Sequence, residues 1–134
     1  MKKIVSLFLA LVLIVAMAVP AMALSSTTKH VLKEGSFSHA NGKTYSVLTD
    51  TAASTSKASA TMSCGMSARL SITLNAELYE KGTDLYLDTK TENGFISDTA
   101  LSVSIDAPSA TKLIQRAAAN YLINGALTTS AVVE

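Results

Sequence analysis

The sequence predicts an all-β fold, an antiparallel two-sheet β-sandwich of about seven or eight short strands. Apolar and polar residues alternate along much of the chain, and Asn-Gly pairs typical of tight turns recur between the alternating segments. Ser and Thr, which suit exposed strand faces, supply 31 of the 111 residues from 24 to 134. The expected organisation is a signal peptide over 1–23 and a single β-sandwich domain over 24–134.

Alternation is clearest over residues 69–79. One face of this segment would carry its apolar side chains, Leu70, Ile72, Leu74, Ala76 and Leu78. The segments 57–66 and 99–106 alternate in the same way, and a shorter one covers 85–87. Because successive side chains in a strand point to opposite faces, each segment predicts a strand with one buried face.

Turn residues separate these strands. The Asn-Gly signals are Asn41-Gly42, Asn93-Gly94 and Asn124-Gly125. A tight hairpin at Lys81-Gly82 would place Leu78 opposite Leu85 and so keep the apolar face continuous across two strands. The small, polar segment 49–56 is interpreted as a connection between the two sheets.

The C-terminal third allows two interpretations. Helical spacing in 110–123 relates Leu113, Ile114, Ala117, Ala118, Tyr121 and Leu122, which favours a helix there. A hairpin closed by Asn124-Gly125 would instead give two more strands, in keeping with the rest of the chain. We favour the strands and keep a β-sandwich with one C-terminal helix near 110–123 as the alternative.

The first 23 residues predict export. Lys2 and Lys3 precede an apolar run over 4–19, and Pro20 ends the helix expected there. Small residues at Ala21 and Ala23 fit a signal peptidase, so we expect cleavage after Ala23 in a bacterial Sec-type pathway and a secreted, extracellular product. The alternative, a retained anchor, is disfavoured because a spanning helix needs about 20 apolar residues. No stable membrane insertion is expected after cleavage.

Single chemistry-bearing residues give weak signals. The alternation in 57–66 puts Cys64, the one cysteine, on the apolar face of the strand and therefore in the core. The alternatives are an intermolecular disulfide and a reactive thiol. His30 and His39 are nine residues apart, a spacing that favours no zinc site. The acidic segment 88–94 resembles a calcium loop faintly, but Lys90 stands where an oxygen ligand is needed. We therefore expect no metal and no cofactor.

Two tyrosines define the candidate ligand-binding surface. A turn at Lys81-Gly82 would place Tyr79 and Tyr86 on the outer face of adjacent strands, with Glu77 opposite Tyr86 and with Asp84 and Arg69 nearby. Aromatic rings beside polar groups are typical of surfaces that stack a sugar or a peptide. The alternative is that the tyrosines shield their neighbours, and the lack of tryptophan counts against a dedicated carbohydrate platform.

These features predict a small secreted, non-enzymatic protein, because no nucleophile–base pair emerges. Its role would be that of an extracellular binding or surface-interaction module, with a glycan, a cell wall or a protein surface as partner. Residues 24–134 carry 9 basic and 10 acidic side chains, so their charge of −1 excludes an electrostatic case for nucleic acid. Two alternatives stay open: a secreted antibacterial or toxin-like protein, and a matrix protein that self-assembles through flat edges such as 52–60.

Overall fold

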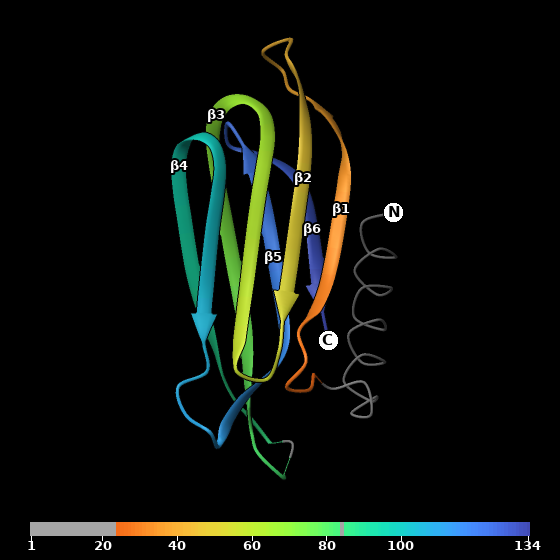
Figure 1. Ribbon diagram of the computed structural model, residues 1–134. Helices are drawn as coiled ribbons and strands as arrows, with labels where there is room; N and C mark the ends of the chain where they lie inside the picture. The colour runs from red at the N-terminus through yellow and green to blue at the C-terminus, as the bar shows by residue number, and fades with distance from the viewer. Residues whose placement is uncertain (1–23, 84) are drawn as a thin grey trace, which may run out of the picture.

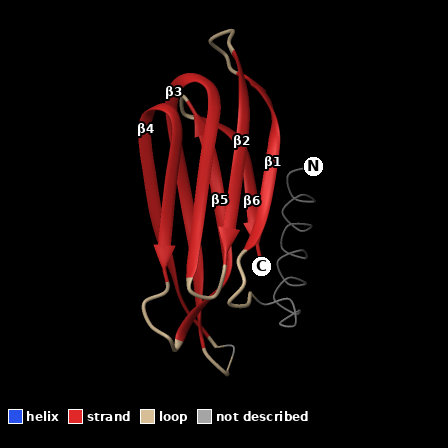
Figure 2. Cartoon of the chain, viewed as in Figure 1, coloured by secondary structure: helices blue, strands red, loops and turns tan. Residues whose placement is uncertain are grey.

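The computed structural model describes residues 24–83 and 85–134. The predicted signal peptide, with Ala21 and Ala23, lies outside the described residues, as does Asp84, which is predicted near Tyr79 and Tyr86. The described chain contains six strands and they account for nearly all of it (Figure 2). They are β1 (Lys29–Ser38), β2 (Thr44–Ala53), β3 (Lys57–Glu80), β4 (Tyr86–Asp106), β5 (Lys112–Ile123) and β6 (Ala126–Val133).

The strands form one continuous antiparallel sheet that coils into a nearly closed barrel (Figure 1). Hydrogen bonding follows the order β1-β2-β3-β5-β6, and β4 pairs with β3. The prediction of an all-β antiparallel fold is confirmed. The prediction of a two-sheet sandwich of seven or eight short strands is wrong, because two of the six strands are 24 and 21 residues long and continue through both sides of the barrel.

Strand β3 lies at the centre of both walls of the barrel. Its first part, 57–63, pairs with β2 on one side and with residues 100–106 of β4 on the other. Its second part, 68–79, pairs with β5 and with residues 86–98 of β4. Between the two parts the register with β4 shifts, and Figure 1 shows both strands turning back at this end of the barrel. The bend therefore replaces the sheet-to-sheet connection that a sandwich would need.

The core fills the inside of the barrel, and most of the residues that alternation predicts to be buried lie in it. The alternating residues Leu70, Ile72, Leu74, Ala76 and Leu78 are all buried. In 57–66 the prediction holds through Cys64, which is buried and whose thiol donates a hydrogen bond to the Met66 carbonyl oxygen at 2.9 Å. Met66 itself is exposed, contrary to the prediction, because the bend breaks the alternation there.

Polar contacts join the opposite walls of the barrel. The hydroxyls of Thr51 on β2 and Tyr121 on β5, both fully buried, are 2.6 Å apart. The Tyr45 hydroxyl accepts hydrogen bonds from the side-chain amides of Asn41 and Asn124 at 3.1 and 3.2 Å. Buried hydroxyls need such partners. These bonds therefore fix the distance between the β1–β2 turn and the β5–β6 turn.

Lysines bridge the seam between β1 and β6. Lys33 donates through Nζ to the Ser130 carbonyl oxygen at 2.6 Å, and Lys29 does the same to Glu134 at 3.2 Å. The two strands share no backbone ladder. Along this seam the two edges of the nearly closed barrel are therefore joined by lysine side chains that reach the backbone carbonyl groups of Ser130 and Glu134.

Several predicted connections differ from the structure. Residues 49–53 belong to β2, with Thr49 and Thr51 buried, and the link to β3 is confined to 54–56. The helix alternative near 110–123 is wrong, because β5 occupies this region and Asn124-Gly125 closes a β5–β6 hairpin with positive φ at both residues. The predicted segment 52–60 is no free edge, since β2 and β3 are both paired on two sides.

Gly94 lies within β4 instead of in the turn that Asn93-Gly94 predicts. It pairs with Ile72, and a Cβ added to it would stand 2.3 Å from Cγ2 of Val103. Val103 belongs to the second part of β4, so the glycine permits the two parts of this strand to pack face to face. The residue is required by packing and not by a turn.

Gly94→Ala should therefore destabilise the fold by about 1–3 kcal/mol, because a methyl group must displace a stiff β-branched side chain. Gly35→Ala is the matched control, since nothing lies within 4 Å of its added Cβ and its effect should stay within about 0.5 kcal/mol. Urea unfolding measures both. Combining Gly94→Ala with Val103→Ala should show strong coupling, and equal stability of the two glycine variants would contradict the packing.

Burial raises the pKa of the Tyr121 phenol above its ordinary value of 10.0. The fold then favours the neutral phenol, so its contribution is complete below about pH 10 and is lost as the pH rises through the raised pKa. The free energy of unfolding should therefore fall as the pH rises above about 10, and that of Tyr121→Phe should fall less over the same range. A decline of the same size in both proteins would count against a buried neutral Tyr121.

Candidate functional site

Tyr79 and Tyr86 form an exposed aromatic pair next to the β3–β4 turn. Tyr79 lies near the end of β3, Tyr86 begins β4, and the two are direct cross-strand partners. Their ring centroids are 5.6 Å apart with an interplanar angle of 71°, an edge-to-face arrangement. Tyr79 is half-buried, whereas Tyr86 is 52% exposed. Tyr86 therefore presents a ring to solvent on a fixed support.

A charged pair borders the two rings. The Tyr79 hydroxyl donates to Oε2 of Glu77 at 3.2 Å, and Nη1 of Arg116 donates to Oε1 of the same carboxylate at 3.1 Å. Nε of Arg116 stands 3.4 Å from a carboxylate oxygen of Glu134, an ion-pair contact. Partial burial and the negative charge of Glu77 raise the pKa of Tyr79, so it acts as a hydrogen-bond donor at neutral pH.

Leucines extend this surface. Leu85 is 58% exposed and Leu87 is 38% exposed, on either side of Tyr86. The β3–β4 register shifts between Leu78 and Tyr79, so that Leu78 faces Asp88 and Leu87 is the extra residue. The predicted pairing of Leu78 with Leu85 is therefore wrong, and so is that of Glu77 with Tyr86, since Glu77 faces Thr89. We call Glu77, Tyr79, Leu85, Tyr86 and Arg116 the tyrosine patch.

The structure brings three of the four predicted ligand-binding residues together. Tyr79, Tyr86 and Glu77 lie in the tyrosine patch, but Arg69 pairs with Ser97 towards the bend, and its backbone N–H donates to Oδ1 of Asn124 at 3.0 Å. Arg116 on β5, the cross-strand partner of Glu77, occupies the place expected for Arg69. Sequence reasoning missed it because it did not align β5 with β3.

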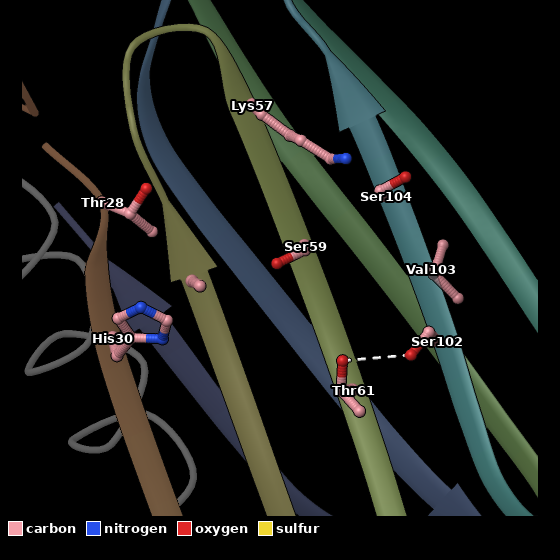
Figure 3. A pocket seen from close by; sticks show the side chains of 9 residues that line it. Thr28, His30, Lys57, Ser59, Thr61, Ser102, Val103 and Ser104 are labelled. Atoms are coloured by element: carbon pink, nitrogen blue, oxygen red, sulfur yellow. Dashed lines mark hydrogen bonds between the residues drawn. The ribbon is translucent and has the colours of Figure 1, made fainter. Parts of the chain in front are cut away.

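A second feature is a polar hollow of about 450 Å³ on the outer face of β1, β2, β3 and β4 (Figure 3). It lies where one row across the strands has short side chains, since His30 is followed by Ala52, Ser59 and Ser104. Lys57, two residues from Ser59 along β3, also lines the hollow. Hydroxyl groups line the side towards β4, where those of Thr61 and Ser102 are 3.1 Å apart. The hollow suits small polar groups more than apolar ones.

His30 at the rim of the hollow is oriented by Asp50. Nδ1 of the imidazole lies 3.0 and 3.1 Å from the two carboxylate oxygens, and the two side chains are partly exposed. A carboxylate that accepts from Nδ1–H leaves Nε2 as a hydrogen-bond acceptor. Sequence patterns did not indicate this pair, because residues 29–35 lack the alternation of apolar and polar side chains that predicts a strand.

Among residues 24–83 and 85–134, no group of three or more His, Cys, Asp or Glu side chains is close enough to hold a metal ion. The described part of the chain has no helix that is long and apolar enough to span a membrane. No protein-family model, curated protein or solved structure matches the chain.

Proposed function

We propose that this protein is a small secreted, non-enzymatic binding module, and that its tyrosine patch holds a glycan or peptide segment of an extracellular surface. The observation that carries the proposal is the exposed ring of Tyr86, supported edge-to-face by Tyr79 beside the Glu77–Arg116 pair. An apolar ring next to fixed donors and acceptors can stack a ligand and orient it at the same time.

Rigidity supports a binding role. Each polar group of the tyrosine patch lies on a strand or directly beside one, and Glu77 is held by hydrogen bonds from Tyr79 and Arg116. A side chain held in place before binding loses little conformational entropy when a ligand arrives. Glu77 in this setting serves to orient Tyr79 and Arg116, which suits recognition of a ligand more than proton transfer to one.

Tyr86→Ala should weaken binding by about tenfold, the loss expected for one exposed aromatic contact. The measurement is co-sedimentation of the chain from Leu24 onward, which contains all six strands, with insoluble peptidoglycan, followed by titration with soluble glycans and peptides. Circular dichroism should show an unchanged fold, because the Tyr86 side chain is exposed.

Two further variants locate the binding surface. Leu32→Ala removes an apolar side chain that is 67% exposed on β1, away from the tyrosine patch, and should leave binding unchanged. His30→Ala removes the rim of the polar hollow and should also leave it unchanged. Loss of binding in His30→Ala alone would move the function to the hollow, and wild-type protein that binds no glycan or peptide would overturn the proposal.

A further inference from the structure

Strand β4 leaves one edge unpaired. Among the described residues, β3 is its single partner, so the backbone groups of 86–98 that point away from β3 have no ladder. Figure 1 shows the first part of β4 at the outer margin of the barrel. Such an edge is a template for another strand unless side chains prevent pairing.

The side chains along this edge are apolar at both ends and charged in the middle. Phe95 is 68% exposed, and Leu87 is 38% exposed. Between them lie Asp88, Lys90 and Glu92, whose cross-strand partners Leu78, Ala76 and Leu74 face the core. Charges on the inward face of an edge strand normally discourage pairing with other chains. Here their order permits an arrangement in which opposite charges attract and the apolar ends also meet.

We propose that two copies of this chain associate through antiparallel pairing of 86–98 with the same segment of the second copy, with Thr91 on the two-fold axis. In this register each Lys90 faces Glu92 of the second copy, and each Glu92 faces Lys90. The exposed Leu87 meets the exposed Phe95 in both directions. One alignment therefore pairs opposite charges and covers apolar side chains together.

Neighbouring alignments are unfavourable. An axis at Lys90 opposes Lys90 to itself and Asp88 to Glu92, while an axis at Glu92 opposes two carboxylates. An axis at Thr89 matches Asp88 with Lys90 but leaves Phe95 without a strand partner. Like charges directly opposite each other destabilise a strand pair. The charges of β4 thus disfavour the axes at Lys90 and Glu92, and the apolar ends favour the axis at Thr91 over the one at Thr89.

This association goes beyond the proposed function and does not rest on it. Tyr86 is five residues from Thr91, so a symmetric pair would carry two tyrosine patches on the same continuous sheet. Loss of the association would leave each patch intact, and loss of ligand binding in Tyr86→Ala would leave the central charges intact.

Sedimentation equilibrium of the chain from Leu24 onward tests the association. The wild type should form dimers whose fraction rises with concentration. Lys90→Glu should weaken dimerisation by about tenfold or more, because two attractive pairs become repulsive, and Glu92→Lys should do the same. The double variant Lys90→Glu/Glu92→Lys restores both pairs with reversed sign and should dimerise like the wild type.

The charge swap is the decisive control, since all four proteins should keep the same fold by circular dichroism. Wild-type protein that stays monomeric up to millimolar concentration would overturn the proposal. So would single variants that dimerise as well as the wild type, because the contact would then lie elsewhere. A double variant as weak as the single ones would refute the pairing of Lys90 with Glu92.

Cross-linking tests the position of the axis. Two Thr91 residues on the axis have Cα atoms about 4.5–5.5 Å apart, within the reach of a disulfide. Thr91→Cys, in a background with the buried Cys64 replaced by Ala, should form an oxidised dimer rapidly. Thr99→Cys, an exposed site on the same strand beyond 86–98, is the matched control and should remain monomeric. Equal cross-linking of the two variants would overturn the register.

Discussion

The bend in β3 is the constraint on which the rest of the barrel depends. Each part of this strand is hydrogen-bonded on both sides, and one face of each part is buried. Because the same chain supplies the centre of both walls, their spacing is set by the residues between Ser63 and Ala68 and by the side chains that meet inside. The buried hydrogen bond between the hydroxyl groups of Thr51 and Tyr121 crosses the space between the two walls. It therefore holds the walls at one separation at this point.

Strand β4 follows β3 around the bend, but within residues 24–83 and 85–134 it pairs with β3 alone. Its two parts also differ in burial. Its second part buries Val103 and Ile105, whereas its first part exposes Leu87 and Phe95. Gly94 permits Val103 to pack against the exposed part from within. The tyrosine patch lies at the opposite end from the bend, where the β3–β4 turn and β5 bring Tyr79, Tyr86 and Arg116 together (Figure 1).

Sequence patterns predicted the parts of the fold where one face is buried, as in 69–79. They failed where buried and exposed residues do not alternate regularly along a strand. Residues 86–98 are mostly exposed on both faces, so alternation gave no strand and Asn93-Gly94 resembled a turn. In β5 the register shift beside Glu77 separates the buried residues Ile114 and Ala117 by three positions, which imitates helical spacing. Arg116 was missed for the same reason, since its place beside Glu77 depends on this pairing.

Hydrogen exchange of the backbone amides tests most directly whether β3 makes the barrel one cooperative unit. The account predicts that amides of 57–63 and 68–79 share the slowest exchange rate, because either part can open only when the whole sheet unfolds. Amides on the outer edge of 86–98 should exchange much faster when the protein is dilute enough to be monomeric. Separate rates for the two parts of β3, with one wall opening while the other stays protected, would show two independent sheets and contradict the account.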